Sequence, residues 1–232
     1  MLSEARYVFM FGPDFNGTCL DHSIPGYTPY EVSTSSFLSV FASRDHGAPV
    51  EVPVLSLSCE DMAEARLARL EELGDNHHLD LSSTEISGEH VGQIAAMRRL
   101  ASLSLAGTRI TDGDLARLSA TLDLRRLNLD RTLVGPAGLV HVGRFLRLQC
   151  LSLNDTRVDD AGLAHLCALG DLEWLSLVGT EVGDRGLEAL AAMGGLRYVS
   201  LVHTRASAGA VAALGRALPA CDINFDTEDV HA

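Results

Sequence analysis

The 232-residue chain contains no lysine, one tryptophan and five cysteines. It also lacks any apolar run near the roughly 20 residues that a membrane-spanning helix needs. No cysteine pair has C-x-x-C spacing, and the odd, scattered set fits neither a disulfide framework nor a zinc site. The N-terminus, MLSEARYVFMFGP, carries an early Glu4 and no small-residue cleavage site, so it is a poor secretory signal. We therefore expect a cytoplasmic protein with reduced thiols.

Basic residues are scarce, and the net charge is −13. An acidic chain repels phosphate backbones, which disfavours nucleic acid as a partner. All the basic side chains are arginine, which indicates a GC-rich and therefore bacterial coding bias. Avoidance of lysine also fits a protein delivered into a host cell, and this alternative stays open.

A fixed period of 24 residues dominates the rest of the sequence. Threonine recurs six times without a miss, at Thr84, Thr108, Thr132, Thr156, Thr180 and Thr204. Five and three residues before it stand leucines, apart from Val199, and two residues after it stands an apolar residue. A fixed period with one residue type at one phase is the signature of a solenoid.

Each period reads as one strand followed by one helix. The L-x-L piece alternates as a short strand does, and an acidic residue such as Asp112, Asp160 or Asp184 follows, in a position to cap a helix. Leucines then recur with i, i+3 spacing on one helical face. The frame predicts a solenoid of about seven repeats plus a final strand over residues 52–226. Residues 1–51 are expected to be a capping segment or a small appended domain, and residues 227–232 an acidic tail.

The pattern L-x-x-L-x-L-x-x-T-x-[IV]-x-D-x-G-L-x-x-L resembles leucine-rich repeats. LSLAGTRITDGDL and LSLNDTRVDDAGL are most similar to the cysteine-containing subclass of F-box proteins, with threonine in the cysteine position. No F-box is visible in residues 1–50. The resemblance implies an α/β fold: a curved leucine-rich-repeat solenoid with parallel strands on the concave face and helices on the convex face, which binds other proteins. We expect the six threonine hydroxyls to satisfy backbone groups of the neighbouring repeat, as a structural ladder.

Residues that alternate with the leucines are predicted to line the concave face. Two clusters differ enough from repeat to repeat to choose a partner. The first is aromatic and apolar, and comprises Trp174, Tyr198, Cys150, Val178 and Asn154. The second is polar, and comprises Arg126, Asn128, Asp130 and Arg131. Exposed aromatic clusters commonly become interface hot spots. The alternatives are that flanking segments cover the aromatic cluster and that the polar cluster pairs with itself.

The sequence contains few signs of catalysis or of a bound cofactor. His78 and Asp80 share a strand face but lack further ligands, so no metal is expected. Cys19 and His22 do not make a triad, and no P-loop, G-x-G-x-x-G, H-E-x-x-H or G-x-S-x-G occurs. We therefore predict a non-enzymatic scaffold that needs no cofactor and binds a protein partner, but neither nucleic acid nor a membrane. The alternatives are an effector or ubiquitin-ligase-type adaptor in a host cell, or an enzyme with its site in residues 1–50.

Overall fold

The computed structural model describes residues 54–56, 78–88, 90–97, 100–119 and 123–226. The chain divides into two compact units, Met1–Glu51 and Val52–Ala232. The predictions made for residues 1–51 and 227–232 lie outside the described residues. The following paragraphs concern the second unit.

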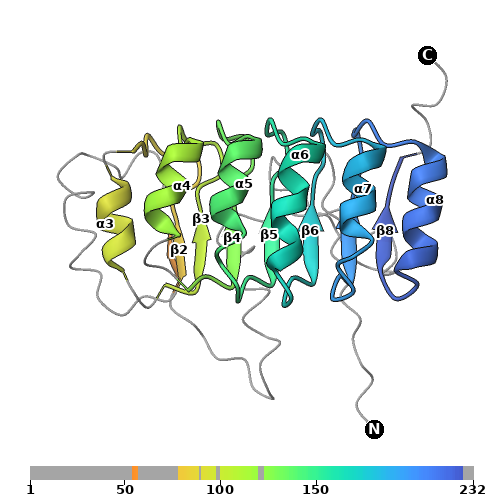
Figure 1. Cartoon of the computed structure of the whole chain (residues 1–232). Helices are drawn as coiled ribbons and strands as arrows, with labels where there is room; N and C mark the ends of the chain where they lie inside the picture. The colour runs from red at the N-terminus through yellow and green to blue at the C-terminus, as the bar shows by residue number, and fades with distance from the viewer. Residues whose placement is uncertain (1–53, 57–77, 89, 98–99, 120–122, 227–232) are drawn as a thin grey trace, which may run out of the picture. The chain divides into compact units, whose positions relative to one another are not determined.

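The second unit contains one parallel sheet whose eight described strands follow each other in chain order (Figure 1). Each strand pairs with the next at an offset of 24 residues, as in Leu79 with Leu103 and Leu151 with Leu175. The strands are β1 (Val54–Ser56), β2 (His78–Asp80), β3 (Ser102–Ser104), β4 (Arg126–Asn128), β5 (Cys150–Ser152), β6 (Trp174–Ser176), β7 (Tyr198–Ser200) and β8 (Asp222–Asn224). The sequence period is thus the pairing register of the sheet.

A helix follows each strand from β2 to β7, and these helices form a row on one face of the sheet (Figure 1). They are α3 (Val91–Ala96), α4 (Asp112–Leu118), α5 (Pro136–Val142), α6 (Asp160–Leu163, continued by the 3-10 helix η4, Ala164–Ala168), α7 (Asp184–Leu190) and α8 (Ala208–Ala217). Paired strands are about 4.8 Å apart, whereas packed helices need about 8–10 Å. The stack is therefore a curved α/β solenoid of leucine-rich-repeat type, with the strands on its concave face, and this prediction is confirmed.

The leucine columns fill the space between the sheet and the helices. Every described leucine or valine at the two strand positions is fully buried, from Leu79 and Leu81 to Val199 and Leu201. The apolar residue two positions after each threonine is also fully buried up to Val182, while Ala206 in the last repeat is only partly buried. Because each repeat supplies the same apolar positions, one continuous core runs along the solenoid.

The threonines act within their own repeat, so the expected ladder between neighbouring repeats is wrong. Each hydroxyl donates to the carbonyl of the leucine three residues earlier, at 2.6–2.7 Å from Thr84 to Thr204. The residue before each threonine takes a positive φ, between 53° and 69°, including the non-glycine residues Arg131 and Asp155. The hydroxyl thus closes the tight turn that ends each strand, since this backbone conformation is costly for a side-chain-bearing residue.

The acidic residues after the turn supply a link between repeats. The sequence suggested that they cap their own helices. Instead, Asp112 accepts a hydrogen bond from the amide of Gly135 at 2.7 Å, and Asp160 accepts one from Gly183 at 2.6 Å. Asp184 does the same with Ser207. Each acceptor therefore satisfies the amide that precedes the helix of the next repeat, which is one of the donors that a helix start leaves unpaired.

The helices also approach each other closely at a small residue. Gly143 has an ordinary helical backbone, but a Cβ atom there would collide with the carbonyl oxygen of His165 in the next repeat. Gly92 in α3 has open space around the same position. Cys167, which occupies the phase of Gly143, is exposed rather than packed, and its thiol lies 3.6 Å from the carbonyl oxygen of Ala189.

Gly143→Ala is expected to lower the free energy of unfolding by about 1–3 kcal/mol, because the two helices must separate to admit a methyl group. Gly92→Ala should raise it by roughly 0.5–1 kcal/mol, since alanine restricts the unfolded chain and no contact opposes it. Urea unfolding of both variants checks the pair. Equal effects of the two substitutions would contradict the predicted helix contact.

Candidate functional site

The sheet brings the two predicted clusters onto its concave face. The residues that precede the first leucine of each repeat form one row across the strands, in which Arg126 pairs with Cys150, Cys150 with Trp174, and Trp174 with Tyr198. Strand alternation turns these side chains away from the core. The residues predicted from spacing alone are therefore neighbours in space.

Trp174 and Tyr198 form a stacked aromatic pair. Their ring centroids are 5.6 Å apart and their planes differ by 6°. Tyr198 is partly buried, and its hydroxyl lies 3.5 Å from the side-chain nitrogen of Asn224, at the long end of a hydrogen bond. Burial raises the pKa of Tyr198, so the hydroxyl keeps its proton at neutral pH. The pair is a rigid apolar shelf with one polar end.

The exposure of this aromatic cluster differs from the sequence prediction. Trp174, Val178 and Cys150 each keep 8% of their surface accessible, so they do not face solvent. Beyond Trp174 the face opens: Tyr198, Val202 and Asn224 are partly exposed and Asp222 is fully exposed. Within the described residues, the accessible end of the face therefore lies on β7 and β8, one strand further along than predicted, and Trp174 supports it from below.

The middle of the concave face carries a buried hydrogen-bond network. Asp130 accepts from the Ser152 hydroxyl at 2.6 Å and from the Asn154 amide at 2.7 Å. Asn154 repeats the arrangement one strand on, accepting from the Ser176 hydroxyl at 2.6 Å and from the Val178 amide at 2.9 Å. An asparagine or aspartate thus pairs the amide that the sheet leaves unpaired where each strand turns.

The polar cluster predicted around Arg126 is largely used inside the protein. Asn128 and Asp130 are buried, and Asn128 accepts from the Asp130 amide at 2.9 Å. Arg131 lies in the exposed turn and forms an ion pair with Asp155 at 3.3 Å. The network was missed because the sequence shows only that small polar residues alternate with leucines. It does not show which of them reach across to the next strand.

Asp130 is the one described carboxyl in this network with a strongly shifted pKa. Desolvation by burial raises its pKa from 3.8 to about 7, although three donors from Ser152 and Asn154 favour the charged form. The exposed carboxylate of Asp155 adds to the upward shift. The folded protein therefore holds a proton on Asp130 at pH values where the unfolded chain has lost it.

Stability should fall as the pH rises from about 4 to about 7, because over that interval the folded state binds more protons than the unfolded state. The slope attributable to Asp130 is up to about 1.4 kcal/mol per pH unit, and it vanishes above the folded-state pKa. Asp130→Asn keeps the acceptor, as Asn154 does in the next repeat, and removes the slope. Urea unfolding followed by the fluorescence of the single tryptophan at several pH values measures the difference. Parallel wild-type and variant curves would disprove the shift.

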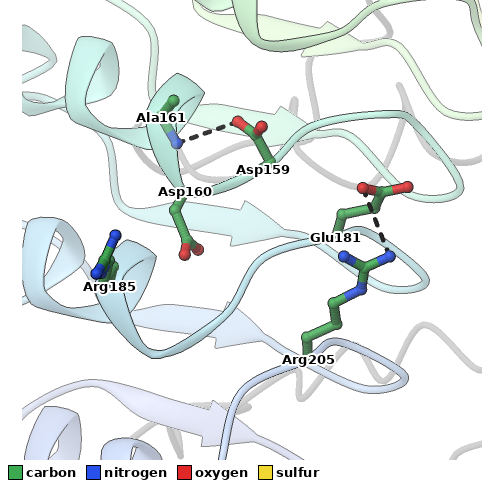
Figure 2. Close-up of a pocket in the computed structure, with 6 residues that line it drawn as sticks. All are labelled: Asp159, Asp160, Ala161, Glu181, Arg185 and Arg205. Atoms are coloured by element: carbon green, nitrogen blue, oxygen red, sulfur yellow. Dashed lines mark hydrogen bonds and ion pairs between the residues drawn. The ribbon is translucent and has the colours of Figure 1, made fainter.

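A charged recess opens where the strands turn towards the helices. Figure 2 shows its lining, which comprises Asp159, Asp160, Ala161, Glu181, Arg185 and Arg205. Asp159 accepts from the amide of Ala161 at 3.0 Å, and Glu181 pairs with Arg205 at 3.5 Å between side chains that are both more than half exposed. Since Asp160 binds Gly183, the carboxylates here already serve the fold, and the recess gathers no acid–base pair for chemistry.

The other candidates for chemistry also have structural explanations. Burial raises the pKa of the Cys221 thiol to about 11, so it is a poor nucleophile at neutral pH. Within the described residues, no three of the histidine, cysteine and acidic side chains gather as a metal site would require, and no helix is long and apolar enough to cross a membrane. The side chain of His78, together with Cys19 and His22, lies outside the described residues.

Comparisons with known proteins support the fold only in outline. No family model and no curated protein matches the chain. Two solved structures from Listeria monocytogenes are similar. One is an internalin (inlF), with 16% identity over 66% of this chain and 50% of that one, and a TM-score of 0.45. The other is an internalin C2, with 18% identity over 70% and 77%, and a TM-score of 0.48. This chain thus matches half the length of the first. At these scores, the fold assignment rests on the register and repeat of this chain itself.

Proposed function

We propose that the chain is a non-enzymatic scaffold that binds a protein partner on its concave face, with the contact centred on Tyr198. The observation that carries the proposal is the stacked Trp174–Tyr198 pair at the edge of the accessible strand face. A rigid aromatic ring that is partly exposed and supported from below loses little conformational entropy on binding. Such residues dominate the energetics of protein interfaces.

The surroundings of Tyr198 favour a protein surface as the partner. The partly exposed Val202 adds an apolar contact, and the neighbouring Asp222 and Asn224 add polar groups at the rim. An apolar centre with a polar rim is the usual anatomy of a protein interface. Because Asp222 is exposed and acidic, a hydrogen-bond donor or a basic side chain of the partner suits this rim best.

The repeat chemistry supports binding rather than catalysis. The residues shared between repeats build the core and the turns, as Leu153 and Thr156 do. The residues that differ lie in the concave rows, where Cys150, Trp174 and Tyr198 take the same place on successive strands. A surface with individual features on a uniform frame suits recognition of one shape.

Tyr198→Ala is expected to weaken partner binding at least about tenfold, because the ring is the accessible part of the shelf. Partners are first identified by affinity capture with wild-type protein, and each dissociation constant is then measured with purified components. Trp174 is the only tryptophan, so a change in its emission on titration places the bound partner near this face.

Ala212→Glu is the matched control, since Ala212 lies exposed on α8, on the opposite side of the sheet. It should leave the affinity unchanged. Tyr198→Phe separates the ring from its hydroxyl and should retain most of the binding. Undiminished binding by a folded Tyr198→Ala protein, with no response of Trp174, would place the partner elsewhere.

A further inference from the structure

The outer surface of the helix row is apolar at its centre. The positions that point away from the sheet on α5, α6 and η4 hold small or apolar side chains, all of them exposed. We call this set the central helix patch: Ala137, Val140, Ala161, Ala164 and Ala168. Val140 is 40% exposed. The other two large apolar side chains exposed in the described residues, Leu133 (49%) and Leu146 (61%), belong to the same repeat and flank α5.

Charged residues avoid this patch and gather on either side of it. The α5 helix contains no aspartate, glutamate or arginine, and the only one of these in α6 and η4 is Asp160, whose carboxylate binds the next repeat. The helices beyond carry both signs: Asp114 and Arg117 on α4, and Arg185 and Glu188 on α7. In a chain with a net charge of −13, a gap of this kind over two adjacent helices is unusual.

We propose that a second copy of this chain covers the central helix patch, related by a twofold axis that runs parallel to the helices between α5 and α6. This axis lies at the middle of the described row from α3 to α8, where two convex surfaces make first contact. It sets α5 of one copy against α6 of the other, so that Val140 faces the small side chain of Ala164. The interface is isologous, as in most homodimers.

The charges flanking the patch are complementary under this axis. It sets α4 of one copy against α7 of the other, with the helices running in the same direction. Arg117 lies nine residues after its threonine and Glu188 eight, so the two stand at nearly the same height. Asp114 and Arg185 lie six and five residues after theirs. One residue of helix rises about 1.5 Å, so each acid meets a base, twice over by symmetry.

A second copy fits this surface better than a strongly charged partner does. Two chains with a net charge of −13 repel each other, and the repulsion is least where they meet through an uncharged face rimmed by opposite charges. The inference goes beyond the proposed scaffold function. A dimer joined at the helices turns the two concave faces outward, so one assembly offers two binding surfaces. Two tethered sites gain avidity for any partner that presents repeated copies.

Sedimentation velocity and light scattering of the full-length protein test the dimer. The wild-type chain is expected to show a concentration-dependent dimer. Val140→Glu places unpaired carboxylates in the interface and should abolish the dimer. Ala212→Glu makes the same change at the same helical phase on α8, outside the patch, and should leave the mass unchanged. Thermal unfolding shows whether each variant is folded.

A charge swap tests the orientation of the two copies. Arg117→Glu alone or Glu188→Arg alone should each raise the dimer dissociation constant about tenfold, because two symmetric pairs become repulsive. Combining both substitutions should restore the wild-type value. A monomeric wild-type protein at every concentration, a dimeric Val140→Glu protein, or a double variant no tighter than the singles would overturn the proposal. Tyr198→Ala should not change the mass, so failure here is separate from failure of the concave-face proposal.

Discussion

The parallel pairing of three-residue strands at an offset of 24 residues is the constraint on which the rest of this structure depends. Strands of this length bury very little by themselves, so each one is stable only between its neighbours. The pairing places equivalent residues next to each other, as Leu127 lies beside Leu151 and Leu151 beside Leu175. It also sets the helices side by side at a larger spacing, and the curvature follows from that mismatch. Continuity of the core and the separation into two faces have the same origin.

Two kinds of polar device complete the pairing at the two ends of each strand-to-helix connection. Asp130 and Asn154 reach across the concave face to the amide of the next repeat. Asp112 and Asp160 reach across the helix side to the amide that precedes the next helix. Both devices satisfy donors that regular pairing leaves over, and both make each repeat depend on the one before it. The threonine does neither, because its hydroxyl fixes the turn inside one repeat.

The sequence was sufficient to predict the solenoid, its register and the identity of its core, because these follow from a period that is written in the leucines. It predicted that Trp174 would lie beside Tyr198, and the rings stack. It did not predict that Trp174 is buried while Tyr198 is partly exposed, since alternation gives the side of the sheet and not the accessibility. The direction of hydrogen bonds was also beyond it: Thr156 and Asp160 have the same phase in every repeat whether they bind their own repeat or the next. The central helix patch went unnoticed because alanine suits a buried helix contact and an exposed one equally well.

The hydrogen-bond network on the concave face stops at Val178, whose side chain has no acceptor for the strand that follows. From that point the rings of Trp174 and Tyr198 replace the chain of amides and carboxylates. In a solenoid, cooperativity passes from each repeat to its neighbour, so a change of linkage is a seam at which local opening can begin. The last two strands, beyond that seam, carry the partly exposed residues of the sheet. A ligand held there would add its own free energy of binding to the segment with fewest polar links, so recognition and resistance to fraying would rise together.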